Sequence, residues 1–413
     1  MPQITASRPV VIAVVAVVVA AIVGLAVFLG LSLRSEPSTP ILPPGSGVEL
    51  QQLYVSPAGD DNTGDGSQAA PLRTIQAALD EAEAGTVVNL APGEYRETLT
   101  TMRDGTPEAP ITIRGPENGT DPAGRRQAVL YGTGRIVNID HNHYTLEGFT
   151  IDGQERLDGA QLPTDLASID AFKAGVQTQV EDSKLIYIGS ADTTRDVTGT
   201  TIRNMFLTEA GTECVRLRNN ANGNAIADSV IQYCGLLGRG DGDGEDDDDR
   251  FPYHNGEGVY IGTSPNSDSQ PMHDNDTSSN NVVTGNVIRT FGSECLDVKE
   301  NAHGNVFEDN ECSANTEPRE FNGSNVELRG HDNVVRGNVI ADSAGWNVKI
   351  QSDDEDDYDN GGNSLENNTL SGSAAEPVRI GTDAPQGAFC GNSVTAAEPV
   401  DGTSPGDITA PCP

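Results

Sequence analysis

The stretch Val215–Ile231 reads VRLRNNANGNAIADSVI, and a phrase of the same form returns until the chain nears its end. In each copy polar residues alternate with apolar ones, an Asn-x-apolar group follows, and a second Asn comes about five residues later, before another apolar pair. The further copies begin at Val259 (VYIG), Leu296 (LDVK), Val326 (VELR), Val348 (VKIQ) and Val378 (VRIG), the last of them partial. Alternation with a period of two is typical of short strands that bury one face.

The spacing of these copies indicates the fold class. The shortest spacings are about 22 to 30 residues, which is too short for a βαβ unit with its helix, and no helical pattern lies between the strands. Stacked coils of a solenoid satisfy both observations, because each coil buries its apolar face on its neighbours. We therefore predict an all-β fold, a single-stranded right-handed parallel β-helix, over residues 51–396, with a C-terminal tail over residues 397–413.

The second Asn of each copy has a structural role in this prediction. Asn side chains stacked at one turn bond to each other up and down a column, and Asn tolerates the left-handed backbone that such turns need. The expected column comprises Asn286, Asn310, Asn338 and Asn368, with Ser229 in the equivalent place.

The six Cys residues fall into three pairs of sequential neighbours, and each pair spans about one coil. Disulfides between adjacent coils are therefore expected, since the distance between such positions suits the bond. The pairs are Cys214 with Cys234, Cys295 with Cys312, and Cys390 with Cys412. No CxxC motif occurs, which argues against a zinc site.

The N-terminal part of the chain predicts an attachment to a membrane. Val10–Leu33 is a nearly unbroken apolar run, about as long as a bilayer-spanning helix needs to be. A secretory signal is usually shorter, and no small-x-small cleavage site follows, so we predict an uncleaved transmembrane signal anchor, with a cleaved signal peptide as the alternative. Residues 1–9 would form a short cytoplasmic tail, residues 34–50 a Pro- and Ser-rich linker, and the large domain would lie on the extracellular face.

The chain carries a formal net charge of −37. Such a charge repels nucleic acid, so no nucleic-acid partner is expected, and in dilute salt it repels acidic polymers as well. High salt screens this repulsion to a few ångströms, so the composition is consistent with a halophilic protein. Disulfides persist in oxidising compartments, which agrees with an external domain.

The segment Tyr54–Glu97 opens the domain with YVSPAGDDNTGDGSQAAPLRTIQAALDEAEAGTVVNLAPGEYRE. Apolar residues at helical spacing from Ile75 to Ala82 predict a short helix that caps the open end of the solenoid. Strands are expected after it at Thr86–Leu90, Ile111–Arg114, Ala128–Tyr131 and Tyr144–Ile151. The segment resembles the opening of the pectate-lyase-like superfamily of parallel β-helix proteins. The resemblance implies the fold and leaves the activity open, because lyases, hydrolases, epimerases and adhesins share this scaffold.

Stacking the copies brings the outward residues of one strand into columns. The first column reads Arg216, Tyr260, Asp297, Glu327, Lys349 and Arg379, and the second reads Arg218, Gly262, Lys299, Arg329, Gln351 and Gly381. Adjacent coils lie about 4.8 Å apart, so Lys299 and Arg329 should project side by side, and we predict that their repulsion lowers the pKa of Lys299. A Lys of lowered pKa is a candidate general base, and Gly262 would leave room beside it for a ligand.

Oxygen donors gather around the same strands. Glu294 precedes the strand of Lys299, and Asn255 and Glu257 belong to the previous coil. Carboxylate and amide oxygens from two coils suit Ca²⁺, which takes about six to eight oxygen ligands.

Three phrases resemble the polysaccharide lyase family of chondroitinase B and alginate lyases. They are NGEGVYIG (255–262), GSECLDVKE (292–300) and ELRGHDNVVRGN (327–338). The resemblance implies a calcium-assisted β-elimination on a polymer of uronic acids, with that polysaccharide as the partner of the domain.

The same resemblance implies roles for individual residues. The base falls on Lys299, the arginine on Arg329, and calcium ligands fall on Asn255 and Glu294. The family's other acidic ligand falls on Gly292, so Glu257 or Asp297 would have to substitute for it.

A second interpretation stays open, in which the chain is a non-catalytic surface solenoid that binds carbohydrate or acts as an adhesin. Lys299 and Arg329 would then be surface charges offset by neighbouring acids, as in an ordinary ladder of ion pairs. Arg218 occupies the matching place in an earlier copy, which indicates that a cation there can belong to the repeat itself.

Overall fold

The computed structural model describes residues 50–116, 120, 124–157, 160–192, 194–238, 255–265, 276–352, 358, 360–374 and 376–413. The predicted cytoplasmic tail, the predicted anchor over Val10–Leu33 and the linker up to residue 49 lie outside these residues. Among the described residues, no helix combines the length and the apolar character that a bilayer-spanning segment requires.

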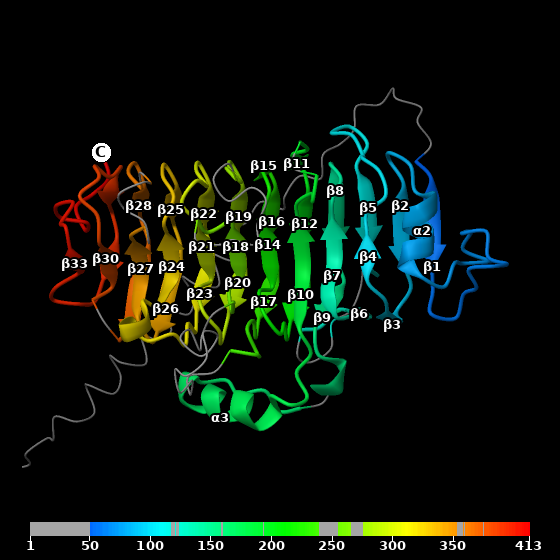
Figure 1. The fold of residues 1–413 in the computed structure, drawn as a ribbon, viewed down its shortest axis with the longest axis horizontal. Helices are drawn as coiled ribbons and strands as arrows, with labels where there is room; N and C mark the ends of the chain where they lie inside the picture. Colours follow the sequence, from blue (N-terminus) through cyan, green and yellow to red (C-terminus); the bar gives the residue numbers. More distant parts are fainter. Residues whose placement is uncertain are drawn as a thin grey trace, which may run out of the picture. The chain divides into compact units, whose positions relative to one another are not determined.

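Three long parallel sheets build the domain Leu50–Pro413 (Figure 1). The first sheet comprises β1 (Gln52–Val55), β2 (Val87–Leu90), β5 (Ile111–Arg114), β8 (Tyr144–Glu147), β12 (Thr201–Arg203), β16 (Ala225–Ala227), β19 (Val282–Thr284), β22 (Val306–Glu308), β25 (Val334–Arg336), β28 (Ser364–Glu366) and β31 (Phe389–Cys390). The second sheet comprises β3 (Gly93–Arg96), β6 (Ala128–Tyr131), β9 (Thr150–Asp152), β13 (Phe206–Thr208), β17 (Val230–Gln232), β20 (Val287–Arg289), β23 (Glu311–Ser313), β26 (Val339–Ser343), β29 (Thr369–Ser373) and β32 (Ser393–Val394). The third sheet comprises β4 (Leu99–Thr100), β7 (Gly134–Ile139), β10 (Ser183–Ile188), β14 (Val215–Leu217), β18 (Val259–Ile261), β21 (Leu296–Val298), β24 (Ser324–Leu328), β27 (Trp346–Ile350), β30 (Val378–Ile380) and β33 (Val400–Gly402).

The chain passes through the three sheets in this order and then begins the next coil, so each coil adds one strand to each sheet. This arrangement confirms the predicted all-β parallel β-helix. One expected strand, Tyr144–Ile151, is two strands, β8 and β9. Gly148 divides them because it turns the chain with a φ of 77°, a conformation that glycine adopts without strain.

Apolar side chains stack in register inside the coils. On the first sheet successive coils place Ile202, Ile226, Val283, Phe307, Val335 and Leu365 above one another. Each of them is at most 1% exposed. Burial of such a side chain stabilises the fold by about 1.5–3 kcal/mol, so the inward positions of the repeated phrase account for the continuous core.

A ladder of Asn side chains runs along one turn, as the sequence predicts. Nδ2 of each Asn donates to Oδ1 of the next at 3.0–3.1 Å, in the order Asn286, Asn310, Asn338, Asn368 and Asn392. The backbone N–H of Ser229 donates to Asn286 at the start of the ladder.

A second Asn ladder, which the sequence analysis did not anticipate, uses the first Asn of each phrase. Its members are Asn224, Asn281, Asn305, Asn333 and Asn363, joined in the same way at 3.0–3.2 Å. Both ladders satisfy buried amide groups between coils, and they therefore hold the coils in one register.

All three predicted disulfides are present. Cys214–Cys234 and Cys295–Cys312 each join neighbouring coils. Cys390 on β31 bonds to Cys412, and β33 pairs with β30. The segment expected to be a tail after residue 396 therefore contributes the last strand of the β-helix.

The helix α2 (Ile75–Glu81) covers the first coil, as predicted (Figure 1). It buries Ile75, Ala78 and Leu79 and contacts β1, β2 and β4. The side chain of Thr74 accepts a hydrogen bond from the backbone N–H of Ala77, which satisfies one of the free donors at the helix start.

An insertion between β9 and β10 was not predicted. It contains the 3₁₀ turn η1 (Glu155–Leu157) and the helix α3 (Leu166–Val176), and a short parallel pair, β11 (Val197–Thr198) with β15 (Ala221–Asn222), follows β10. A small cluster formed by Leu157, Ile169, Tyr233, Leu236, Phe291 and Ala314 attaches this insertion to the coils. Ile169 of α3 is buried, and Leu166, Phe172 and Val176 pack against the same small cluster. This helical spacing of apolar residues was a signal that the sequence analysis did not use.

We expect Asn310→Ala to destabilise the domain by about 1–3 kcal/mol, because the variant leaves buried amide groups above and below it without partners. Asn310 accepts from the backbone and side chain of Asn286 and donates to Val283 and Asn338. The midpoint of urea unfolding measures the loss. Asn62→Ala, at an exposed turn, serves as the control, and equal midpoints for the two variants would contradict a stabilising role for the ladder.

Candidate functional site

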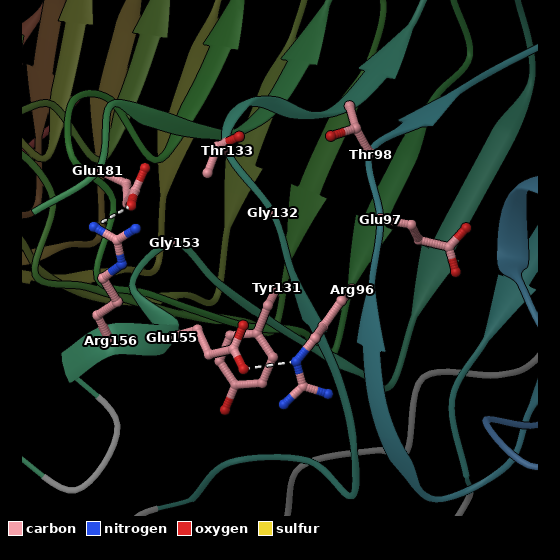
Figure 2. A pocket seen from close by; sticks show the side chains of 10 residues that line it. All are labelled: Arg96, Glu97, Thr98, Tyr131, Gly132, Thr133, Gly153, Glu155, Arg156 and Glu181. Carbon is pink, nitrogen blue, oxygen red and sulfur yellow. Dashed lines mark hydrogen bonds and ion pairs between the residues drawn. The ribbon is translucent and has the colours of Figure 1, made fainter.

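One surface cavity of about 340 Å³ lies on the early coils, beside β3, β6 and η1. Figure 2 shows two ion pairs in its walls, Arg96 with Glu155 at 2.6 Å and Arg156 with Glu181 at 2.7 Å. The guanidinium of Arg96 lies 5.7 Å from the ring centroid of Tyr131. None of the residues that the sequence singled out lines this cavity, so the candidate site lies elsewhere.

The third sheet carries both predicted columns. Strand register joins the members of the first column in the predicted order, Arg216, Tyr260, Asp297, Glu327, Lys349 and Arg379. The backbone N–H of Lys299 donates to Ile261 and that of Arg329 donates to Val298, both at 2.8 Å. Lys299 and Arg329 therefore come from neighbouring coils at equivalent positions, as the repeat predicts.

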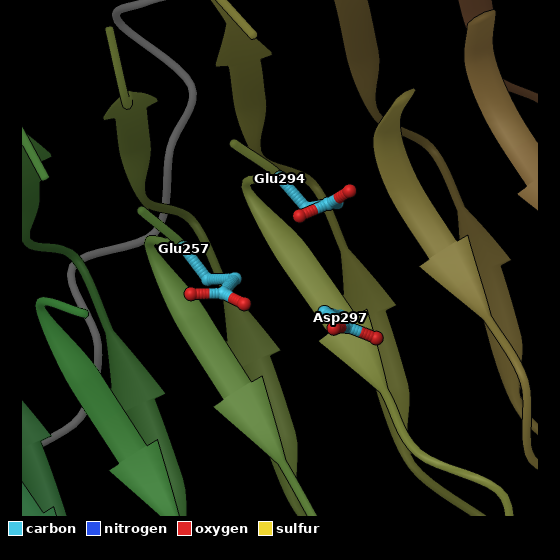
Figure 3. Close-up of side chains that lie close together, drawn as sticks. All are labelled: Glu257, Glu294 and Asp297. Carbon is cyan, nitrogen blue, oxygen red and sulfur yellow. The ribbon is translucent and has the colours of Figure 1, made fainter. Parts of the chain in front are cut away.

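Three carboxylates meet at the start of two of these strands (Figure 3). Glu257 precedes β18, Glu294 precedes β21, and Asp297 belongs to β21. One carboxylate oxygen from each lies within 4.8 Å of the others, and all three side chains are buried. Two predicted metal ligands, Glu257 and Asp297, are thus brought beside a third, Glu294.

Burial controls the protonation of two of these acids. Burial, reinforced by the charges of Glu213 and Asp297, raises the pKa of Glu257 to about 8. Burial, reinforced by Glu317 and Glu327, raises the pKa of Glu294 well above its usual value. Among the described residues, no cation forms an ion pair with Glu257 or Glu294. The charge of Lys299 lowers the pKa of Glu257, but burial and the neighbouring acids outweigh it.

Lys299 is held in a tight ion pair. Its Nζ lies 2.5 Å from Oδ2 of Asp297 and 4.7 Å from the ring centroid of Tyr260. Burial and the nearby Arg329 lower the pKa of Lys299, but Asp297 and Glu327 outweigh them and raise it. The predicted lowering of this pKa is therefore wrong, because the sequence argument counted the cation of the next coil and omitted the carboxylate two residues away.

Arg329 and Lys349 share one carboxylate. Nε of Arg329 lies 2.9 Å from Oε1 of Glu327, and Nζ of Lys349 lies 2.8 Å from the same oxygen. Burial would raise the pKa of Glu327, but Arg329, Lys349 and Lys299 overcome it and lower the pKa to about 2. Nε of Arg329 is also 3.9 Å from Asp297, so one chain of charges links Lys349 to Lys299.

The loop between β23 and β24 folds over this face. Thr316 donates from its N–H and its hydroxyl to the carbonyl of Gly292, both at 2.8 Å, and the carbonyl of Asn322 accepts a hydrogen bond from Lys349 at 3.4 Å. Burial, with Glu327, raises the pKa of Glu317 in this loop to about 8. Sequence reasoning gave Glu317 no place in the site.

Two glycines bear on the expectations from the sequence. A Cβ at Gly292 would lie 2.3 Å from the carbonyl oxygen of Cys234, so this backbone has no room for an acidic side chain there. A Cβ at Gly262 would lie 3.1 Å from Ala302 and 3.2 Å from Lys299, so these two residues leave little room for a side chain at Gly262. Asn255 is half-buried with a φ of 59°, two residues before Glu257.

Two residues of the candidate site, Tyr260 and Glu213, were not assigned roles from the sequence. The ring of Tyr260 receives three cations, with Arg216 at 4.6 Å, Arg218 at 4.9 Å and Lys299 at 4.7 Å from its centroid. Glu213, at the same place as Glu257 in the previous copy, pairs with Arg216 at 2.6 Å and with Lys184 at 3.2 Å. Glu213, Glu257 and Glu294 occupy the same place before three successive strands of the third sheet, and this column was the signal that could have found Glu213.

No family model matches the sequence. A segment of 66 residues is 46% identical to YwoF of Bacillus subtilis, a protein described as uncharacterized, and a segment of 72 residues is 40% identical to pectate lyase PEL9 of Emericella nidulans. The segments are 16% and 17% of this chain and 14% and 17% of those proteins. The chain therefore matches about a sixth of the length of these curated relatives, and the matches show similarity over one segment only.

Among solved structures, the chain is similar to an alginate lyase from Paenibacillus sp. strain FPU-7. The TM-score is 0.57 at 18% identity, and the match covers 85% of this chain and 97% of that one. Similarity at this identity concerns the fold, and it agrees with the three parallel sheets and with the opening segment. The chain therefore has the parallel β-helix fold.

Proposed function

We propose that this protein acts on acidic polysaccharide and cleaves a polymer of uronic acids by β-elimination. The observation that carries the proposal is the meeting of three buried carboxylates with Lys299 and Arg329 on one face of the third sheet. An alginate lyase and a pectate lyase stand among the proteins similar to this chain, which supports a substrate that bears carboxylates.

The carboxylates fit a calcium ion. Glu257 and Glu294 lack a cationic partner among the described residues, and Oε2 of Glu257 and Oδ1 of Asp297 are buried there without a hydrogen bond. Hard cations prefer carboxylate oxygens of this kind. Glu257, Glu294 and Asp297 would hold the ion, with Asn255 as a further ligand. Bound Ca²⁺ would neutralise a substrate carboxylate and thereby acidify the C–H bond next to it.

Lys299 and Arg329 would assist the elimination. Lys299 would take the proton from C5 of the uronate, the bond from C4 to the glycosidic oxygen would break, and a water molecule would donate the proton with which that oxygen leaves. Arg329 would lie against the negative charge that develops on the substrate. Lys299 keeps its own proton while it is paired with Asp297, so the reaction requires this pair to open in the complex with substrate.

Binding without catalysis is the second candidate, and one observation favours it. The pair of Lys299 with Asp297 at 2.5 Å and the raised pKa of Lys299 are typical of a structural ion pair. A solenoid that only binds polysaccharide would keep this pair closed.

We expect the protein to release unsaturated uronate ends from a polyuronate in high salt with calcium, as followed by ultraviolet absorbance. Lys299→Ala should lower the rate by about 100-fold or more, because it removes the general base. Arg336→Ala is the matched control, since it opens an exposed pair with Glu308 on the first sheet.

Equal rates for Lys299→Ala and the control would remove Lys299 from the mechanism. A folded wild-type protein that forms no product from any polyuronate would favour the binding function.

We expect calcium to bind the protein in the absence of polysaccharide, with heat detectable by titration calorimetry and a higher melting temperature. Glu294→Gln should weaken the binding at least about tenfold, because one charged ligand is lost. Glu308→Gln, at the exposed pair on the first sheet, should leave it unchanged. Calcium binding that survives in Glu294→Gln would place the ion elsewhere.

We further propose that Val10–Leu33 anchors the protein to a membrane with the domain on the extracellular face, on the length and apolar character of that run. The full chain should then stay with membranes through washes in high salt and alkali, and detergent should release it. Recovery as a soluble protein shortened at its N-terminus would support the cleaved signal peptide instead.

A further inference from the structure

A second surface cavity, of about 470 Å³, lies over the late coils of the third sheet. The cavity is lined by Arg319, Glu320, Asn322, Trp346, Gln351, Arg379 and Asp401. They come from the loop that covers the candidate site and from β27, β30 and β33. We call this cavity the Trp346 groove.

The Trp346 groove continues the columns of the candidate site. Trp346 pairs in register with Ser324, and Lys349 and Arg379 follow Glu327 in the first column. With coils about 4.8 Å apart, Arg379 lies about 14 Å beyond Asp297 along the stack. A polysaccharide chain that lies along the coils at the candidate site would therefore reach this groove.

Trp346 offers a binding surface with an unused donor. Its side chain is about 5% exposed, and Nε1 is buried without a hydrogen-bond partner among the described residues. The guanidinium of Arg319 lies 5.2 Å from its ring centroid. A buried indole N–H usually has a partner, so this unpaired donor in the lining of a cavity points to a ligand with an acceptor oxygen.

Asp401 holds the two arginines of the groove in place. Its two carboxylate oxygens accept from Arg319 at 2.9 Å and from Arg379 at 3.2 Å. Arg319 makes a further pair with Glu376 at 3.1 Å. Among the described residues Arg379 forms an ion pair with Asp401 alone, and its other N–H donors have no partner in that part of the chain.

The mixture of groups selects one class of ligand. A bare polyanion would suit a wholly cationic pocket, whereas this groove also contains acceptors in Asp401, Gln351 and Asn322. A neutral sugar would match the acceptors and the aromatic ring but would add no carboxylate to the one that Asp401 already offers to Arg379. A uronic acid unit carries one carboxylate and several hydroxyl groups, and it matches both sets.

We propose that the Trp346 groove is a subsite for one uronic acid unit of the polysaccharide, with Arg379 bound to its carboxylate. Nε1–H of Trp346 donates a hydrogen bond to a ring or hydroxyl oxygen of the uronic acid unit. The side chains of Gln351 and Asp401 accept hydrogen bonds from the hydroxyl groups of that unit. The inference rests on the proposed function, because it names the unit that the same polymer places beyond the cleavage site.

Tryptophan fluorescence tests this subsite directly, since Trp346 is the single Trp of the chain. The full chain is titrated with uronate oligosaccharides of increasing length at constant ionic strength. We expect a saturable change in Trp346 emission, with affinity that rises with length until the oligomer spans the groove. Neutral oligosaccharides of the same length should give a response at least about tenfold weaker, because Arg379 then gains no carboxylate from the ligand.

Arg379→Gln should weaken binding of the uronate oligomer about tenfold or more, since a charge-assisted hydrogen bond is lost. Arg379→Lys keeps the charge and should fall between that variant and the wild type. Arg156→Gln, in the other cavity (Figure 2), is the matched control and should bind as the wild type does. Circular dichroism and melting temperatures establish that each variant is folded.

The subsite is overturned if emission does not change saturably, if neutral and acidic oligomers respond equally, or if Arg379→Gln binds as tightly as Arg156→Gln. A saturable change in Trp346 emission without formation of unsaturated product would support the subsite and contradict the proposed β-elimination. Product formation without any emission response removes the subsite and leaves the elimination in place.

Discussion

In-register stacking of parallel strands is the constraint on which this structure depends. Because every coil repeats the path of the one before it, residues at equivalent positions of the phrase become vertical neighbours about 4.8 Å apart. Inside the coils this rule places aliphatic side chains on aliphatic side chains, and at two turns it places Asn on Asn. A shift of the register would separate the apolar stacks and leave the amides of both ladders without partners.

The same rule creates an electrostatic problem on the third sheet. Charged residues at equivalent positions become close neighbours and are largely buried, which costs several kcal/mol for each ion that lacks a partner. Most of the acids on this face meet cations within the network. Glu213 lies between Lys184 and Arg216, and Glu327 lies between Arg329 and Lys349. Glu257 and Glu294 stand apart, because burial and neighbouring acids raise their pKa values instead. This imbalance distinguishes a candidate cation site from the ordinary ladders beside it.

The candidate site and the Trp346 groove share one piece of architecture. The loop between β23 and β24 supplies Glu317 and Asn322 above the charge network, and η3 (Arg319–Phe321) supplies Arg319 to the groove. A single inserted segment thus shapes both the buried cluster and the open cavity next to it. The outward columns of the third sheet continue from one to the other, so a linear polymer is the ligand shape that this face suits.

The repeated phrase by itself determined the β-helix, the order of both outward columns, the disulfide pairs and one Asn ladder. These features follow from the position of each residue within its copy of the phrase, and that position can be read from the sequence. Only the tertiary structure decided the state of Lys299, the burial of Glu317 and the placing of Trp346 and Arg379 in one cavity. These depend on side-chain direction and on loops and insertions that differ from coil to coil, such as the one over Lys349 and the one that holds α3. The charge of Lys299 illustrates the difference, because its column predicted a repelling Arg329, whereas the fold turned its ammonium onto Asp297 at 2.5 Å.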